Sequence, residues 1–337
     1  MNLVSSGLLR LVAAALALLA IACGGGGSGS PTSPGPVTPT PTAPATPDAW
    51  AVEGTVVTTL GRLPVSGASV KAEFGDAIVT DGQGRFRLEG SSPPSPSTFN
   101  VLVTAPGHVE REVWLEWRRG TRTITIDIVA EAAPFSLTFY REIARDGFDG
   151  TDGLADLAVW RSAPSFYIRT VDENGDAIGT RIVGTITDTI RSSVREFTGG
   201  RFGASTIETG SAARRERPGW IYVHVLHETD EDVCGSAFVG SNPGTIELLY
   251  GGCGCGNGRV SSDIVAHEVG HALGFFHVAN RQSVMYPFSS GRCPSAELTE
   301  ADRHHAAVAY SRPRGNRDPD RDPESVRLAV PRIRVVN

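Results

Sequence analysis

Two histidines one helical turn apart, followed by a glycine and a third histidine, constrain the fold of this sequence more than any other feature. The segment reads His267-Glu268-Val-Gly-His271-Ala-Leu-Gly274-Phe-Phe-His277. On a helix, His267 and His271 share one face, so both imidazoles can reach one Zn²⁺ ion. Glu268 lies on the same stripe and can approach a metal-bound water as a general base without being a ligand. Gly274 lets the helix end and the backbone reverse, so His277 can return as the third ligand.

Three histidine ligands leave one coordination position open, which is the requirement for a catalytic zinc ion. Ser261 or Ser262 is a suitable N-cap for the helix, and Asp263 in the first turn suits the helix dipole. The alternative is that the histidines are satisfied within a helical core. The sequence therefore predicts one catalytic Zn²⁺.

A second motif follows the histidines. Ser283-Val-Met285-Tyr286-Pro287 resembles the Met-turn, and with the long zinc motif it identifies the segment as similar to metzincin metallopeptidases, most of all to the matrixin branch. The resemblance implies an α+β catalytic domain with a twisted, mainly parallel sheet, and it places Met285 beneath the zinc without binding it. Two departures are Val278, where the branches usually carry Ser, Glu, Asp or Pro, and the lack of a recognisable cysteine-switch segment.

The catalytic module is expected at residues 135–311. A helix is predicted at Thr185–Phe197 from the spacing of its apolar residues, and another from Thr299, with Asp302 completing a capping box, to about Tyr310. Strands are predicted at Phe135–Tyr140, Ser165–Val171, Ala204–Glu208, Trp220–Leu226 and Thr245–Tyr250. An extended substrate is expected along an edge strand around Thr245–Tyr250. Residues 312–337, rich in Arg, Asp and Pro at their start, are expected to be a charged, solvated tail.

Other acidic and histidine positions give weaker patterns. Asp146, Asp149 and Asp152 recur every third residue but miss the calcium-loop pattern, so a polar loop is the expectation and no structural calcium is established. His224 and His227 would face opposite sides of a strand. His304 and His305 lack ligand spacing, so packing or surface roles are expected.

An earlier module is expected at residues 49–131. Short β-branched runs separated by turn signals predict strands at Ala51–Thr58, Ala68–Phe74, Gly84–Leu88, Phe99–Thr104 and Thr121–Ile128. Three segments resemble the carboxypeptidase regulatory-like (transthyretin-like) domain: Pro64–Val70, Thr80–Phe86 and Ala105–His108. The resemblance implies an all-β sandwich, with spacing, folding or adhesion as its role, so that the chain has several domains.

The N-terminus indicates export. Residues 1–22 contain an apolar run of signal-peptide length, and Leu19-Ala-Ile-Ala-Cys23 resembles a bacterial lipobox. This resemblance implies lipidation of Cys23, followed by a Gly/Pro/Thr-rich linker over residues 23–48. The chain is then expected to be a membrane-anchored lipoprotein at the bacterial cell surface or the periplasmic side. The alternative is an ordinary signal peptide with an incidental cysteine.

The remaining cysteines lie in the catalytic module at Cys234, Cys253, Cys255 and Cys293. In an exported protein, four cysteines suggest two disulfides with three possible connectivities. A Cys253–Cys255 bond is geometrically unfavourable, so each is expected to pair with Cys234 or Cys293. A second zinc ion at residues 252–256 is the alternative, although C-x-C is not the usual zinc spacing.

The composition excludes one class of partner. The chain has 31 Lys+Arg against 37 Asp+Glu and a formal net charge of −6, which leaves no global basic footprint for nucleic acid. The zinc motif and the Met-turn resemblance make a zinc-dependent endopeptidase the leading hypothesis. Its substrates would be proteins or peptides. The alternative is a surface binding or adhesion lipoprotein whose metal-binding module is catalytically silent.

Overall fold

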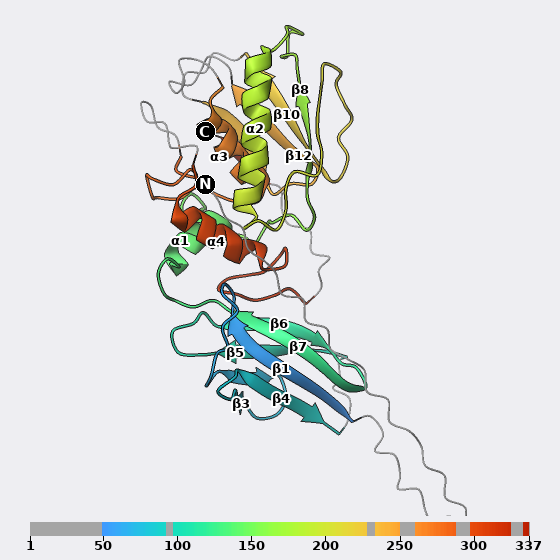
Figure 1. The fold of residues 1–337 in the computed structure, drawn as a ribbon, viewed down its shortest axis with the longest axis vertical. Helices are drawn as coiled ribbons and strands as arrows, with labels where there is room; N and C mark the ends of the chain where they lie inside the picture. The colour runs from blue at the N-terminus through green and yellow to red at the C-terminus, as the bar shows by residue number, and fades with distance from the viewer. Residues whose placement is uncertain are drawn as a thin grey trace, which may run out of the picture. The chain divides into compact units, whose positions relative to one another are not determined.

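The computed structural model describes residues 49–91, 97–227, 233–249, 260–287, 297–324 and 333–336 of the 337-residue chain. These residues form a mixed α/β structure in which strands outnumber helices (Figure 1). The predicted signal segment, the linker and Cys23 lie outside the described residues. Within the described ranges, no helix combines the length and the apolarity needed to cross a bilayer.

Residues 50–128 form two sheets that share one hydrophobic core. The strands are β1 (Trp50–Thr58), β2 (Ser69–Ala72), β3 (Ile78–Val79), β4 (Arg85–Gly90), β5 (Thr98–Thr104), β6 (Arg111–Glu116) and β7 (Gly120–Ile128). One sheet has the order β4-β1-β7 and the other β3-β2-β5-β6. Side chains of β5 alternate between buried and half-buried, as expected for a strand with one face on a core. The predicted strands coincide with β1, β2, β4, β5 and β7, while the likeness to the regulatory-like domain stays a prediction.

The remaining elements build a six-stranded sheet with helices packed against it. The strands are β8 (Ser165–Arg169), β9 (Ile207–Gly210), β10 (Trp220–Leu226), β11 (Gly235–Val239), β12 (Gly244–Leu249) and β13 (Ile333–Val336). The helices are α1 (Leu137–Arg145), α2 (Thr180–Phe197), α3 (Ser262–Ala272) and α4 (Glu300–Tyr310). The strand order is β13-β11-β12-β10-β8-β9, and the last four strands run parallel, as predicted. Helix α3 packs against α2, β11 and β12, so the sheet and a second helix together fix its position.

The predicted strand at Phe135–Tyr140 is wrong, because this segment enters α1. The side chain of Ser136 caps the helix by accepting a hydrogen bond from the backbone N–H of Phe139. Tyr140, Ile143 and Ala144 are buried, and their spacing of three and four residues follows the helical period. The cap and the buried helical face therefore decide the structure of this segment.

The expectation of an edge strand around Thr245–Tyr250 is also wrong. Strand β12 lies inside the sheet, with β10 parallel on one side and β11 antiparallel on the other. The antiparallel strand β11 went unpredicted because its sequence is short and rich in small residues. Strand β13 pairs antiparallel with β11, so the Ile333–Val336 segment belongs to this sheet.

The segment after α4 is not a solvated tail. Arg312, Asn316 and Asp320 are at most 3% exposed, and the segment runs beside β6. The backbone N–H of Glu112 donates to the carbonyl of Asp320 (3.0 Å), and the N–H of Asp322 donates to the carbonyl of Glu112 (2.9 Å). Composition favoured solvation, but charged residues can be buried when they are paired with one another.

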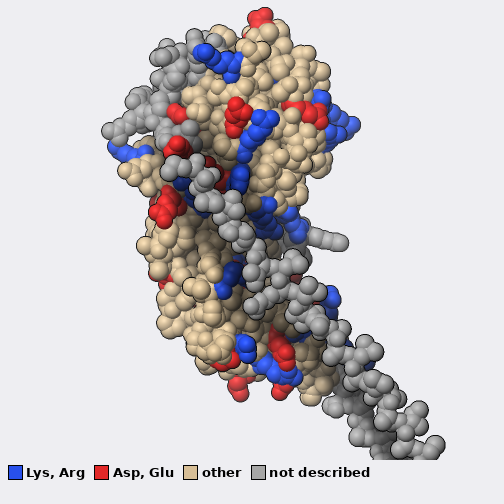
Figure 2. Space-filling model, in the orientation of Figure 1, with Lys and Arg blue, Asp and Glu red and all other residues tan. Residues whose placement is uncertain are grey.

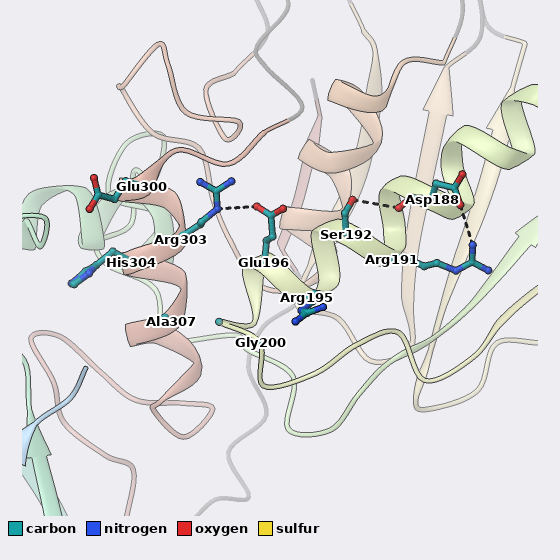
Figure 3. A pocket seen from close by; sticks show the side chains of 11 residues that line it. Asp188, Arg191, Ser192, Arg195, Glu196, Gly200, Glu300, Arg303, His304 and Ala307 are labelled. Carbon is teal, nitrogen blue, oxygen red and sulfur yellow. Dashed lines mark hydrogen bonds and ion pairs between the residues drawn. The ribbon is translucent and has the colours of Figure 1, made fainter. Parts of the chain in front are cut away.

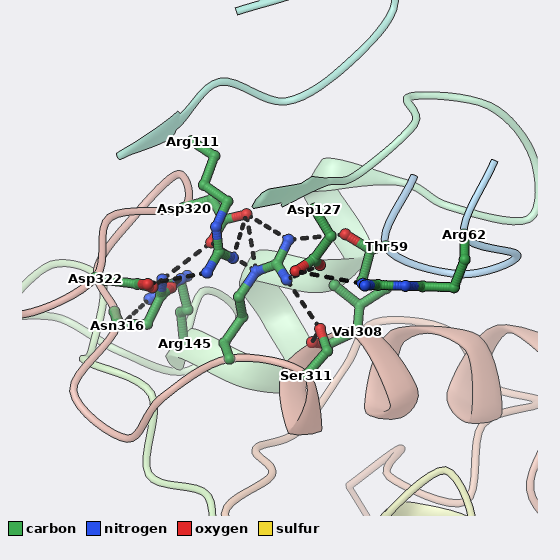
Figure 4. A network of polar contacts seen from close by, with 11 residues as sticks. Thr59, Arg62, Arg111, Asp127, Arg145, Val308, Ser311, Asn316, Asp320 and Asp322 are labelled. Carbon is green, nitrogen blue, oxygen red and sulfur yellow. Dashed lines mark hydrogen bonds and ion pairs between the residues drawn. The ribbon is translucent and has the colours of Figure 1, made fainter. Parts of the chain in front are cut away.

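Arginine and aspartate side chains join this segment to β6 and β7 (Figure 4). Arg111 of β6 bonds Asp320 (3.2 Å) and Asp322 (2.9 Å), while Arg312 bonds Asp320 (2.8 Å) and Asp127 of β7. Burial alone would raise the pKa of Asp127, but the charge of Arg312 leaves that pKa below its usual value. The ion pairs therefore tie residues 312–322 to the sheets formed by residues 50–128.

Candidate metal centre

Helix α3 is buried from Ile264 to Ala272, and side chains from distant segments satisfy its carboxyl end. The Trp160 indole N–H donates to the carbonyl of Ala272 (2.8 Å), and the Tyr310 hydroxyl donates to the carbonyl of Leu273 (2.9 Å). The last carbonyls of a helix have no partner within the helix, so these bonds replace the water they would otherwise need. They hold the end of α3 where the chain turns back.

The three predicted histidines meet at one point. Gly274 has a φ of 109°, and a Cβ atom there would lie 2.9 Å from the carbonyl carbon of Ala158, so a side chain does not fit this turn. The reversed chain brings His277 to His267 and His271. One ring nitrogen from each lies within 4.8 Å of the others, and the Nε2 atoms of His267 and His271 are 2.9 Å apart. Among the described residues, this is the one cluster of three or more metal-ligating side chains.

The outer hydrogen bonds of the rings show which nitrogens face the centre. Nδ1 of His267 donates to the carbonyl of Val284 (2.6 Å), and Nδ1 of His271 donates to that of Phe275 (2.7 Å). A carbonyl only accepts, so each Nδ1 carries the proton and each Nε2 keeps a lone pair.

The two Nε2 atoms are 2.9 Å apart, close enough for one cation to bind both. Burial and the neighbouring histidines hold the pKa of His271 well below its usual value. A second proton on the His271 ring is therefore disfavoured. Neutral imidazole nitrogens are ligands that Zn²⁺ accepts readily. The donor set therefore fits the predicted ion.

Met285 packs against the turn of α3 that carries the histidines. It is fully buried, and a Cβ atom on Gly270 would lie 2.4 Å from its Sδ atom. Gly270 lies three residues after His267, on the same side of the helix. The absence of a side chain at Gly270 thus lets Met285 lie where the Met-turn resemblance implies, and its supporting role stays a prediction.

Helix α4 holds the segment that contains Met285. Thr299 and Asp302 form the predicted capping box, in which the Asp302 carboxylate accepts from the Thr299 backbone N–H (2.8 Å). The same buried carboxylate accepts a hydrogen bond from the Ser283 hydroxyl (2.6 Å). The sequence predicted the cap, but its second contact links residues that only the fold brings together.

The candidate base, Glu268, is fully buried and lies beside β11. A Cβ atom on Gly235 would lie 2.8 Å from Oε1 of Glu268 and 2.9 Å from the carbonyl oxygen of Glu247. The carboxylate can approach the strand because Gly235 has no side chain. Nothing in the sequence distinguished Gly235 from the many other glycines.

Asp149 is a functional candidate that sequence analysis missed. Nδ1 of His277 donates to Oδ2 of Asp149 at 2.5 Å, so all three histidines bond an oxygen through Nδ1. Asp149 lies in the predicted polar loop after α1 and is 49% exposed. The contact spans 128 positions of the chain, and no local pattern could have found it.

His305 has the packing role that was predicted for it. The ring is fully buried, its Nε2 accepts from the backbone N–H of Ser136 (2.9 Å), and it stacks on Phe135. Burial lowers the pKa of His305. This histidine is therefore a neutral structural group that positions the start of α1.

Cys234 is bonded in a disulfide. The other cysteines, including Cys253, Cys255 and Cys293, lie outside the described residues, so the connectivity and the alternative second zinc site stay predictions.

A groove between α2 and α4 is lined by charges that pair with one another (Figure 3). Arg303 bonds Glu196 and Arg191 bonds Asp188, each at 3.0 Å, and His304 lies near Arg303. Across the described part of the face in Figure 2, acidic and basic side chains are interspersed, and neither sign gathers in one patch. The groove contains none of the three clustered histidines, and we assign it no function.

Comparison with known proteins adds a match over part of the chain. Residues 245–311 match the family model described as Matrixin. Metalloproteinase-II from Bacteroides fragilis is similar, with 12% identity and a TM-score of 0.32. The match covers 77% of this chain and 84% of the metalloproteinase chain. A mutant catechol 1,2-dioxygenase from Acinetobacter radioresistens is 17% identical with a TM-score of 0.21, covering 26% of this chain. No curated protein matched the sequence.

The structural similarities are too low to carry a conclusion, and this chain spans only 54% of the length of the dioxygenase. The matrixin match is informative because it includes all three histidines, Glu268 and Met285. Matrixins are zinc-dependent peptidases, so the match and the histidine cluster together support a zinc metallopeptidase.

Proposed function

We propose that this chain is a zinc endopeptidase that hydrolyses peptide bonds in protein or peptide substrates. The convergence of His267, His271 and His277, with Glu268 adjoining them on α3, carries the proposal. Three ligands leave a coordination position open, which distinguishes a catalytic from a closed structural zinc site.

The three imidazoles would hold Zn²⁺ through the nitrogens that face the centre. Bound there, the ion supplies Lewis-acid chemistry, which makes water more acidic and polarises the substrate carbonyl. Glu268 accepts a proton from the attacking water and passes it to the leaving amine. The space left by Gly235 lets the carboxylate occupy its place between α3 and β11.

Hydrogen bonds on the far side of the rings prepare the ligands. The carbonyls of Val284 and Phe275 and the carboxylate of Asp149 fix the three ring orientations. Such partners also raise the basicity of the ligating nitrogen, because they stabilise the partial positive charge that metal binding places on the ring. The site is thus oriented before any ion binds.

We also propose that the chain acts outside the cytoplasm, anchored by a lipid at Cys23. The lipobox-like sequence and the proline-rich linker support this location, since a linker of that composition is a semi-rigid spacer. Replacing Cys23 with serine would move the protein from the membrane fraction to the soluble fraction. Unchanged membrane association of that variant would contradict lipid anchoring.

The direct test of the activity is metal-dependent cleavage. The purified chain is expected to contain zinc, to cleave a library of unstructured peptides, to lose this activity with a chelator and to regain it with Zn²⁺. A chain that binds zinc but cleaves no peptide would instead support the alternative of a silent binding module.

A further inference from the structure

Strand β13 covers the outer edge of β11 (Gly235–Val239). The pairing is antiparallel, with Val336 opposite Ser236 and Ile333 opposite Val239. The other side of β11 pairs with β12. Among the described strands, β11 would therefore form the edge of the six-stranded sheet if β13 moved away.

Both ends of β11 lie against the candidate catalytic helix. At its start, Gly235 adjoins the Glu268 carboxylate, since a Cβ atom there would lie 2.8 Å from Oε1. Just beyond its end, the backbone N–H of Gly240 donates to the carbonyl of His271 (2.9 Å). Strand β11 thus runs alongside the helix turn that carries the proposed base and two of the proposed ligands.

An exposed strand edge in this position would recognise an extended peptide. The peptide adds a strand through main-chain hydrogen bonds, which do not depend on the identity of its side chains. These bonds also fix the distance between the peptide backbone and the site. Such a peptide would need the same N–H and carbonyl groups of β11 that β13 now pairs with. One edge cannot hold both strands.

The direction of β13 brings one of its ends close to the proposed base. Its later residues lie nearer to Glu268, because Val336 pairs with Ser236, which follows Gly235. A peptide paired with β11 in the same direction would therefore place the residues before the bond to be cut where β13 now lies. In this conformation the three histidines are at most 5% exposed and Glu268 is fully buried, so a peptide needs a rearrangement to reach them.

We propose that β13 regulates this site: it occupies the outer edge of β11 and competes there with an extended peptide substrate. The proposal rests on the proposed peptidase function. Displacement of β13 opens the edge, and its return closes it, so the chain regulates access to its own site.

Attachment to the rest of the chain makes this competition effective. Residues 312–322 are held by the buried ion pairs with Arg111 and Asp127, and this segment ends eleven residues before Ile333. A short tether gives a linked segment an effective concentration of about 1 mM, so a segment with a Kd of about 0.1 mM would raise KM about tenfold.

The test compares the full chain with one that lacks residues 325–337. The truncated chain is expected to have a KM about tenfold lower for an unstructured peptide, at unchanged kcat. A synthetic peptide of residues 331–337 is expected to inhibit the truncated chain competitively. A second variant, Arg334→Pro with Val335→Pro, removes pairing groups without shortening the chain, and Arg334→Lys is its control.

Two further measurements do not depend on catalysis. Hydrogen exchange at the amides of Ser236–Val239 is expected to be faster in the truncated chain, and a fluorescent 331–337 peptide is expected to bind it more tightly than the full chain. Equal KM values, or equal exchange and equal peptide binding, would overturn the proposal. If no form cleaves peptides, the proposed function fails, and the two binding measurements still decide whether β13 covers the edge.

Discussion

Two buried polar clusters lie in this protein, and they differ in how charge is balanced. Around Arg312, each arginine faces an aspartate, so positive and negative groups satisfy one another. Around His271, the oxygen partners lie on the outer side of the rings, and ring nitrogens converge within 4.8 Å of one another. The first cluster balances its charges within the protein, whereas the second gathers the ring nitrogens that a cation site needs.

This difference separates a structural polar cluster from a binding site. Burial is costly for both, because water can no longer solvate their polar atoms. A network of ion pairs offsets that cost within the protein, whereas clustered imidazole nitrogens can also bind a cation. The comparison predicts that damage to the Arg312 cluster reduces stability, and that damage around His271 reduces metal binding and activity.

The largest change in stability is expected from Asp320→Ala. It leaves buried Arg111 and Arg312 short of a counter-charge, which typically costs about 3–5 kcal/mol. Urea denaturation would measure the free energy of unfolding. Glu110→Ala is the control, because its ion pair with Arg321 is exposed and such pairs are worth at most about 1 kcal/mol. Equal effects of the two substitutions would contradict a structural role for the network.

A smaller loss is expected from Gly270→Ala. The added methyl group would meet Met285, and such overpacking typically costs about 1–3 kcal/mol. Gly184→Ala in α2 is a matched control, because nothing lies within 4 Å of its Cβ position. In a compatible conformation this change typically stabilises by about 0.4–1 kcal/mol. Thermal unfolding of both variants measures the contrast, and similar shifts would show that Met285 does not pack as described.

Asp149→Ala is expected to weaken zinc binding about 10–100-fold, as the loss of an outer partner of a histidine ligand typically does. Asp149→Asn keeps an oxygen acceptor and should restore much of the affinity. Competition with a chelator measures the zinc Kd, and the visible spectrum of the cobalt-substituted protein reports on ligand geometry. Asp152→Ala, in the same loop, is the control, and an equal loss in it would show that the Asp149 contact is not specific.

The smallest effect is expected from acidification acting on His305. Burial lowers its pKa in the folded state below 6.5, so the unfolded chain binds the proton more readily. The stability is full above pH 6.5 and is lost as the pH falls below 6.5 toward the folded pKa. His305→Gln removes this contribution, so its unfolding free energy should fall less over the same range. Parallel curves for the two proteins would contradict the neutral role.

Local sequence patterns predicted the elements whose signals lie within a few residues. The spacing of His267 and His271, the turn at Gly274 and the capping box of Thr299 and Asp302 are of this kind. Their geometry depends on helix period and backbone freedom, which the chain specifies locally.

Contacts between distant segments were not predictable in this way. Asp149 meets His277, and Gly235 meets Glu268, only because the fold brings their loops and strands together. The residues after α4 looked solvated because their partners, Arg111 and Asp127, lie about two hundred positions earlier. Composition describes a segment alone, whereas burial depends on the partner that it finds.

The most direct test of the central claim is peptide turnover per bound zinc ion in the native chain and in Glu268→Gln. Both proteins are expected to bind one zinc ion, because Glu268 is not a proposed ligand. Loss of the general base is expected to lower turnover about 10²–10⁴-fold in the variant. Equal turnover by the two zinc-loaded proteins would contradict the role of Glu268 and the peptidase mechanism built on it.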